Sequence, residues 1–250
     1  MNRVVSWFSC GAASAYATVL AKKKYGDRLE AVYCRVAEEH PDNLRFLKQF
    51  VDKTGIDVKI IGDEKMNYSI YEVFKNRKFI KGQTGAPCTM VLKKWVRRDY
   101  ERPDDVQIFG YTAEEGSRVD RFIDANNHVD ADFILYDEGI TKQQCMDWFQ
   151  SMGFDMPTMY KLGYPNNNCV GCVKGGMGYW NAIRRDFPDA FEKMAQLERE
   201  LGHALLKDKN GAIYLDELDP TRGNFKRDVP KDCSFTCEWE QINLLEKEDE

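Results

Sequence analysis

Short apolar runs alternate with helical patterns in the first half of the chain, and this alternation limits the fold more than any other feature. Two of the runs, at residues 4–8 and 29–36, are continuously apolar, as in strands buried on both faces. Helical patterns follow them and end at Gly26 and Gly55. Further strands are predicted at residues 58–61 and 106–109. The sequence therefore predicts an α/β fold with a mainly parallel, doubly wound sheet, which binds ligands beyond the carboxyl ends of its strands.

The size and charge of the chain limit the kinds of protein that it can be. Its 250 residues, 43% of them hydrophobic, suffice for one α/β domain with a full core. The first eight residues are too short for a cleavable leader, and no apolar run approaches the roughly 20 residues of a membrane span. We therefore expect a cytoplasmic protein with no membrane partner. A net charge of −5 disfavours general nucleic-acid binding, although a local basic groove remains compatible with it.

The strand–helix alternation stops near residue 155. Beyond it follow a loop rich in Gly, Asn and Cys at 163–178, a helical pattern at 188–206 and a strand candidate at 213–218. The aromatic-rich segment 178–191 fits either a packing helix or a substrate lid. We therefore predict a nucleotide-binding domain at 1–155, a Cys-rich C-terminal appendage that binds metal at 156–240, and an acidic tail at 241–250.

A loop of small residues joins the first predicted strand to the first helix. It reads Ser9, Cys10, Gly11, Ala12, Ala13 and Ser14. Small residues at such a turn let backbone N–H groups and a helix N-terminus approach an anion closely, although small residues are also common in ordinary tight turns. The loop lacks the lysine of a Walker loop and the glycines of a dinucleotide fingerprint. A different type of phosphate loop is therefore predicted.

The order of several motifs resembles one known family. HPDN stands at 40–43, GAPCT and LK within 85–93, GYTAEEGSR at 110–118, and NNNCVGCVKGG at 166–176. Together they resemble the phosphoadenosine phosphosulfate (PAPS) reductase family of the PP-loop ATP pyrophosphatase superfamily, whose fold is adenine nucleotide alpha hydrolase-like. The resemblance spans roughly residues 4–240. The phosphate loop of that superfamily reads S-G-G-x-x-S, and here Cys10 replaces the first glycine.

The resemblance implies roles for particular residues around an adenine nucleotide such as ATP. Residues 9–14 would hold its phosphates, the backbone around Cys34 and Arg35 would bracket the adenine, and Gly110 with Tyr111 would approach the ribose or α-phosphate. Lys93, which follows the cysteine of the CT…LK motif, would meet a phosphate or sulfate.

Two arginines would complete the anion site. Arg118 and Arg121 stand three residues apart, which places both guanidinium groups on one side of a helix. The alternative is a solvated basic patch paired with the neighbouring carboxylates. We predict Lys93 and Arg118 as catalytic residues and Arg121 as an additional nucleotide contact.

The eight cysteines divide by their neighbours. Cys34 and Cys145 fall in apolar patterns and are predicted to be core thiols. Cys169 and Cys172 form a C-x-x-C in a polar loop, which is half of a metal site. Spacing alone favours a zinc site completed by Cys233 and Cys237. The family resemblance implies instead a [4Fe–4S] cluster on Cys88, Cys169, Cys172 and Cys233, with Cys237 as the alternative fourth ligand.

Three functions fit these features. The first is an ATP pyrophosphatase that adenylates an acceptor for sulfur transfer, with a sulfur-donor protein and a nucleic-acid acceptor as possible partners. The second is a reductase of adenylylated sulfate. The reductases carry an E-C-G-x-H motif near the C-terminus, and neither its glycine nor its histidine is present in the corresponding segment 232–241. The third is a non-enzymatic nucleotide sensor with structural zinc.

Overall fold

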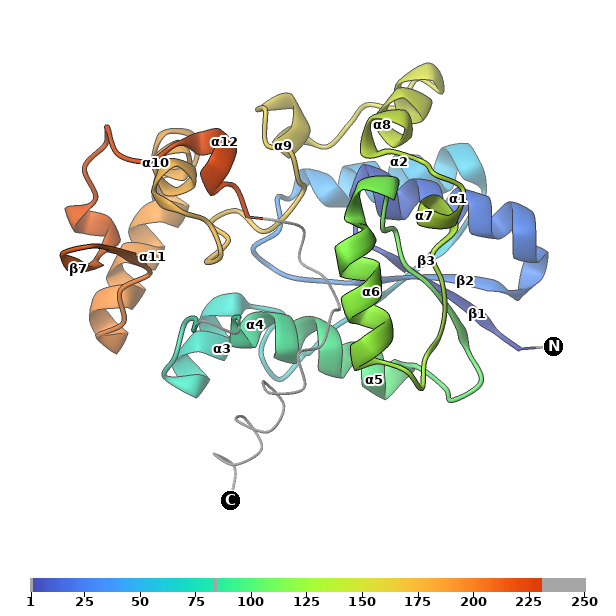
Figure 1. Cartoon of the computed structure of the whole chain (residues 1–250), viewed down its shortest axis with the longest axis horizontal. Coiled ribbons are helices and arrows are strands. Elements are labelled where there is room, and N and C mark those ends of the chain that lie inside the picture. Colours follow the sequence, from blue (N-terminus) through green and yellow to red (C-terminus); the bar gives the residue numbers. More distant parts are fainter. Residues whose placement is uncertain (1, 83–84, 231–250) are drawn as a thin grey trace.

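A five-stranded parallel sheet forms the centre of the chain (Figure 1). The computed structural model describes residues 2–82 and 85–230. The strands are β1 (Val4–Phe8), β2 (Leu29–Cys34), β3 (Val58–Ile61), β4 (Val106–Ile108) and β5 (Asp130–Asp132). Their order is β3-β2-β1-β4-β5, so the winding of the sheet reverses between β1 and β4. In sheets of this kind, ligands bind at the carboxyl edge where the strand order reverses.

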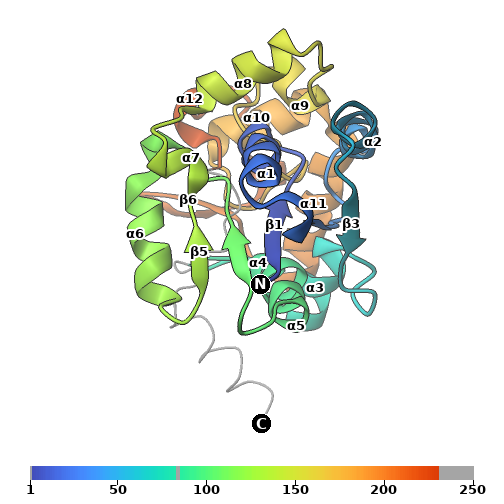
Figure 2. The same ribbon diagram turned by 90° about the vertical axis from the view of Figure 1, so that its right-hand side faces the viewer.

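Side chains of the central strands alternate between the two faces of the sheet. In β1, Val4 and Phe8 belong to one buried cluster, whereas Val5 and Trp7 belong to another. Helices α1, α2 and α8 cover the first face, and α5 and α6 cover the second (Figure 1). Figure 2 shows β5 and β3 at opposite edges of the sheet. Burial on both faces explains why all residues of β1 except Ser6 are apolar.

The helices connect the strands and then form a C-terminal group. Their bounds are α1 (Ala12–Tyr25), α2 (Asp42–Thr54), α3 (Ile70–Arg77), α4 (Pro87–Thr89), α5 (Val96–Tyr100), α6 (Gly116–Ala125), α7 (Ile134–Asp137), α8 (Lys142–Ser151), α9 (Thr158–Lys161), α10 (Met177–Asp186), α11 (Pro188–Leu201) and α12 (Phe225–Asp228). A π-helical stretch, Met90–Trp95, joins α4 to α5. Across the described part of the chain, no helix combines the length and the apolar character that crossing a bilayer requires.

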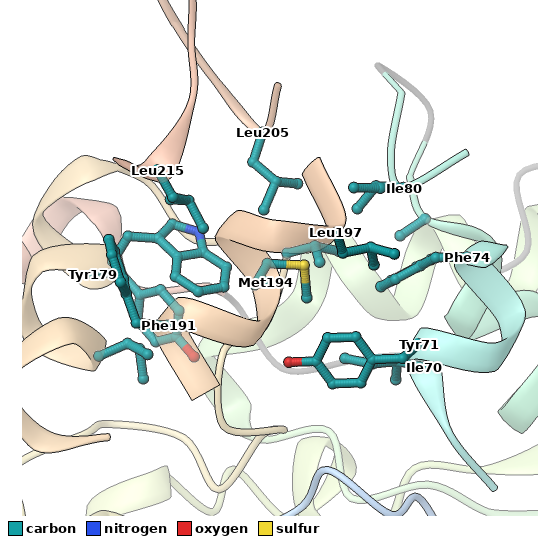
Figure 3. Packing of buried hydrophobic residues seen from close by; sticks show 14 of the residues in the cluster. Ile70, Tyr71, Phe74, Ile80, Tyr179, Phe191, Met194, Leu197, Leu205 and Leu215 are labelled. Atoms are coloured by element: carbon teal, nitrogen blue, oxygen red, sulfur yellow. The ribbon is translucent and has the colours of Figure 1, made fainter. Parts of the chain in front are cut away.

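The C-terminal helices share a core with helices of the first half. A short hairpin, β6 (Leu206–Asp208) and β7 (Gly211–Ile213), follows α11. Phe74 and Ile80 pack with Met194 and Leu197, so residues from both predicted domains form one cluster (Figure 3). In α10, Tyr179 and Trp180 are buried in this cluster, which identifies the aromatic-rich segment as a packing helix.

The sequence predicts the elements of the central sheet well. β1 and β3 have the predicted bounds, and the predicted strands at 29–36 and 106–109 are present but end two residues and one residue early. The parallel, doubly wound sheet is confirmed. The predicted acidic tail at 241–250 lies outside the described residues.

The elements beyond residue 180 differ from the prediction. The helix predicted at 188–206 ends at Leu201, because Gly202 takes the left-handed conformation that terminates helices. The strand predicted at 213–218 is wrong: β7 ends at Ile213, and a capping box starts the 3₁₀-helix Leu215–Glu217. β5 was not predicted because its sequence, Asp-Ala-Asp, lacks an apolar pattern.

Glu198 fixes α11 to the segments that follow it. Its side chain is fully buried, and its carboxylate accepts hydrogen bonds from the backbone N–H groups of Leu205 and Leu215. Replacing Glu198 with alanine would leave two buried donors unpaired, so we expect the free energy of unfolding to fall by about 2–4 kcal/mol. Urea denaturation of Glu198→Ala measures this loss, with the exposed Glu200→Ala as the control. Equal stability of the two variants would refute this role.

Glu198 also predicts how stability changes with pH. Burial raises the pKa of Glu198 from 4.5 to about 7, against the opposing effect of the two N–H donors. The folded protein therefore holds this proton more tightly than the unfolded chain. The resulting contribution to stability is complete below about pH 4.5 and is lost as the pH rises through about 7. Comparing unfolding at pH 6 and pH 8 should show this loss for the wild type and a smaller one for Glu198→Ala.

Candidate functional site

A cavity lies where β1 and β4 end, at the point where the winding of the sheet reverses. Its walls come from the turn after β1, the segment after β4, and five further segments of the chain. It encloses about 70 Å³, which is less than the roughly 300–1,000 Å³ of pockets that enclose whole ligands. The enclosed part therefore fits a compact group such as one anion. The lining residues are Trp7, Ser9, Gly11, Ala13, Ser14, Lys93, Phe109, Gly110, Tyr111, Arg118, Lys142, Tyr160, Asn167 and Asn168.

The turn after β1 has the backbone of a glycine loop although a cysteine stands in it. Cys10 has a φ of 56°, in the left-handed region that favours glycine. Its side chain is fully buried, and burial raises the pKa of the Cys10 thiol well above its usual value. The protonated thiol is a poor nucleophile and a poor metal ligand. Cys10 therefore shapes the loop and leaves the chemistry to other residues.

Serine side chains close the loop on itself. The Ser14 hydroxyl accepts a hydrogen bond from the Ser9 backbone N–H at 3.0 Å and donates to the Gly11 carbonyl at 3.1 Å. The two serine hydroxyls are 2.8 Å apart. These bonds hold the N-terminus of α1 toward the cavity, where the helix dipole favours a negative charge.

Gly110 lets the segment after β4 approach this loop. A Cβ atom at position 110 would lie 2.5 Å from the Ser14 Cα and 2.6 Å from its backbone nitrogen. Those are backbone atoms and cannot move aside without changing the loop. Only glycine therefore fits here, because the two turns that form the cavity pack backbone against backbone.

Three cationic side chains line the cavity, and among the described residues that line it there is no carboxylate. Lys93 extends from the π-helical stretch, Arg118 from α6, and Lys142 from the start of α8. Arg118 is 9% exposed, lies over the Tyr111 ring with its guanidinium carbon 4.7 Å from the centroid, and pairs with Glu115. Together with the N-terminus of α1, these side chains make the cavity electropositive.

Glu39 holds one of these cations in place. One carboxylate oxygen accepts from Lys93 Nζ at 3.1 Å, and the other accepts from Tyr33 Oη at 2.5 Å and Asn43 Nδ2 at 3.1 Å. The side chain of Glu39 is 3% exposed and that of Lys93 is 12% exposed. A buried ion pair with this many hydrogen bonds keeps the lysine ammonium charged and directed at the cavity.

Asn43 and Asn167 extend this network to the loop after β1. Asn167 Nδ2 donates to Asn43 Oδ1 at 2.8 Å and to the Cys10 carbonyl at 2.9 Å. Asn43 belongs to the HPDN motif and Asn167 to the NNN motif, yet sequence reasoning assigned no role to Glu39, Asn43 or Asn167. For Asn43 and Asn167 the signal was their position within those motifs, and Glu39 directly precedes the first of them. An isolated asparagine or glutamate in a sequence carries no chemical assignment.

The structure brings together most of the residues predicted to bind a nucleotide. Eight line the cavity, namely Ser9, Gly11, Ala13, Ser14, Lys93, Gly110, Tyr111 and Arg118, while Cys10 and Ala12 lie in the same turn. Cys34 and Arg35 do not line it: the thiol of Cys34 is buried in the core beside Trp7, and Arg35 lies over the Tyr68 ring. Cys34 and Cys145 are core thiols, as predicted.

Arg121 lies apart from Arg118. Its side chain is exposed, and its Nε donates to the Ser117 carbonyl at 3.0 Å. The helix α6 therefore presents the two guanidinium groups to different surroundings, and only Arg118 reaches the cavity. A spacing of three residues leaves an angle of about 60° between side chains on a helix, which is enough to separate them here.

The cysteine loop lies beside the C-terminal end of the described chain. Tyr179 Oη accepts from the Cys172 backbone N–H at 2.9 Å and donates to the Cys169 carbonyl at 3.2 Å, which fixes the C-x-x-C turn. Asn166 Nδ2 donates to the Pro230 carbonyl at 2.9 Å.

The structure describes only some of the predicted metal ligands. Cys88, Cys169 and Cys172 are partly buried and pack against the same hydrophobic core. Within the described residues, no three His, Cys, Asp or Glu side chains form a group that could hold a metal ion. Cys233 and Cys237 lie outside the described residues. A metal centre on these cysteines would therefore depend on the C-terminal pair.

Comparison with protein-family models and with curated proteins identified no relative of this chain. The assignment of the cavity rests on the geometry and charge of its own residues.

Proposed function

We propose that this chain is an adenine-nucleotide-binding enzyme of the PAPS reductase family, an ATP pyrophosphatase that adenylates an acceptor for sulfur transfer. The observation that carries the proposal is the cavity at the N-terminus of α1, which three cations line without a carboxylate among the described lining residues. Its position where the sheet reverses its winding is the usual one for nucleotides in such folds. The small volume fits the phosphate end of the ligand, with the nucleoside extending beyond the enclosed part.

The proposed reaction uses these residues to handle charge. An acceptor oxygen attacks the α-phosphorus of ATP, pyrophosphate leaves with the electron pair of the broken P–O bond, and the acceptor becomes adenylated. Sulfur from a donor then displaces AMP. Lys93, held by Glu39, and Arg118 would stabilise the charge that develops on the phosphate oxygens. The backbone N–H groups of residues 9–14 would orient the phosphates before the attack.

A [4Fe–4S] cluster on Cys88, Cys169, Cys172 and Cys233 is part of this proposal. Thiolates are the usual ligands of such clusters, which can carry sulfide or electrons. The packing of Cys88, Cys169 and Cys172 against one hydrophobic core supports it. Zinc on Cys169, Cys172, Cys233 and Cys237 is the competing assignment, and it would leave Cys88 without a role in metal binding.

Calorimetric titration with ATP tests the proposed site. At Gly11 a Cβ atom has ordinary contacts at 3.4 Å or more, and the φ of −93° suits any residue, so Gly11→Val should fold. Its side chain would fill the space beside the α1 N-terminus, and we expect ATP binding to be abolished. Arg118→Ala should weaken binding by about tenfold to a hundredfold, or about 1.5–3 kcal/mol.

The chain supplies a control for this experiment. Arg121→Ala removes a guanidinium from the same helix outside the cavity, so ATP affinity should stay within about twofold of the wild type. Unchanged affinity in both Gly11→Val and Arg118→Ala would reject the site. Release of AMP and pyrophosphate from ATP would support the enzyme, thiol-dependent release of sulfite would favour the reductase, and binding without turnover would favour the sensor.

A further inference from the structure

We propose that the ligand of the cavity must donate a hydrogen bond to Asn167 Oδ1, so that the cavity favours an oxyanion with its own or a neighbouring O–H group over sulfate. This inference rests on the proposed anion site and adds a requirement that positive charge alone does not impose. It follows from a chain of hydrogen bonds that begins at Glu39 and ends at the cavity wall.

Glu39 fixes the orientation of the first amide in this chain. An ionised carboxylate accepts hydrogen bonds and donates none. The atom of Asn43 that lies 3.1 Å from Glu39 is therefore the amide nitrogen, Nδ2. The other end of this side chain is then the oxygen, Oδ1, and it faces Asn167 as an acceptor.

Asn43 in turn fixes the amide of Asn167. The amide nitrogen of Asn167 lies 2.8 Å from Asn43 Oδ1 and 2.9 Å from the Cys10 carbonyl, and both of these oxygens are acceptors. A flipped amide would place Asn167 Oδ1 against two other oxygens, which is unfavourable. The orientation of Asn167 is thus determined by the hydrogen-bonding groups around it.

This arrangement leaves a buried acceptor without a donor in a side chain that lines the cavity. Asn167 is 7% exposed and lines the cavity, and no group in the described part of the chain donates to its Oδ1. Burying an acceptor without a donor is costly, so a ligand that supplies an O–H or N–H there gains affinity. Lys93 and Arg118 line the same cavity and favour a negative charge there. A ligand that meets both requirements is an anion with a hydrogen-bond donor.

Common oxyanions differ in this respect. Sulfate carries no proton near neutral pH, whereas hydrogen phosphate has a similar size and charge and carries one O–H group. The donor can also come from a second source, because a nucleotide phosphate without a proton has ribose hydroxyls nearby. The shared chemistry is an O–H group beside an oxyanion, and the experiment separates the two sources.

Calorimetric titrations of the full-length protein with phosphate and with sulfate, at pH 7.5 and constant ionic strength, test the proposal. We expect phosphate to bind at least about tenfold more tightly than sulfate. Asn167→Ala should reduce this ratio to within about twofold. Asn181→Ala is the matched control, because its Nδ2 also donates to two carbonyls and its Oδ1 also has no partner in the described part of the chain, but it does not line the cavity. The Asn181→Ala variant should therefore keep the wild-type ratio of phosphate affinity to sulfate affinity.

A second pair of titrations tests whether a ribose hydroxyl is the group that donates to Asn167 Oδ1. If phosphate and sulfate bind equally, AMP should bind at least about tenfold more tightly than 2′,3′-dideoxy-AMP, and Asn167→Ala should remove that difference. Equal affinities in both pairs overturn the proposal, and so does a preference that Asn167→Ala leaves unchanged. The wild-type comparison holds even if Asn167→Ala fails to fold. Binding of neither anion nor nucleotide would instead reject the proposed function.

Discussion

Replacing Glu39 with glutamine is expected to lower the free energy of unfolding by about 3–5 kcal/mol, because the ammonium of Lys93 then loses its buried counter-charge. Three donors converge on the carboxylate of Glu39. Glutamine offers one acceptor oxygen and turns an N–H₂ group toward at least one of these donors. ATP binding should weaken as well, since Lys93 would no longer be held toward the cavity.

A double-mutant cycle separates the ion pair from the rest of the network. Lys93→Met removes the cation, and the double variant Glu39→Gln/Lys93→Met removes both charges. Losing both partners usually costs less than leaving one buried charge, so the double variant should be more stable than Glu39→Gln alone. Glu72→Gln, at an exposed position of α3, is the control. Additive losses in urea denaturation would mean that Glu39 and Lys93 contribute independently.

Protein purified without oxygen is expected to be brown and to lose this colour in a Cys88→Ser variant. Thiolate ligation holds iron–sulfur clusters, and replacing one ligand of a [4Fe–4S] centre commonly removes the cluster. The measurements are the visible absorption and the iron and sulfide content, expected at about four of each per chain. Cys145→Ser is the control, because Cys145 is fully buried in the core on the face of the sheet that α1 covers.

Zinc would give a different pattern. A zinc site on Cys169, Cys172, Cys233 and Cys237 predicts colourless protein with about one zinc per chain. Cys88→Ser would leave that zinc content unchanged. Such a result would reject the iron–sulfur cluster and favour the nucleotide sensor.

The parts of the fold that the sequence predicts are those in which local pattern and burial agree. β1 is apolar except at Ser6 because both faces of the sheet are covered, and Gly55 ends α2 in the left-handed conformation. β5 was missed because its pairing with β4, rather than its own composition, makes it a strand.

The residues of the candidate site likewise divide into those that the sequence predicts and those that only the structure reveals. The loop at residues 9–14, Gly110 and Arg118 could be predicted from motifs, since each motif lies at the end of a predicted strand or the start of a helix. Glu39 and Asn167 could not, because their roles come from hydrogen bonds across more than 50 and more than 100 residues of sequence. Arg121 was predicted with Arg118 because spacing alone does not tell which side of α6 faces the sheet.

The core shared by α3 and the C-terminal helices limits how this molecule can move. Phe74 of α3 and Met194 of α11 are fully buried in the same cluster. A hinge motion that swung the C-terminal helices away from the sheet would expose this apolar surface to water, at a large cost in free energy. This shared core therefore holds the cysteine loop at a nearly constant distance from the cavity. Any closure around a ligand has to come from loops and side chains such as Tyr160, whose hydroxyl lies 3.2 Å from the Ala12 nitrogen.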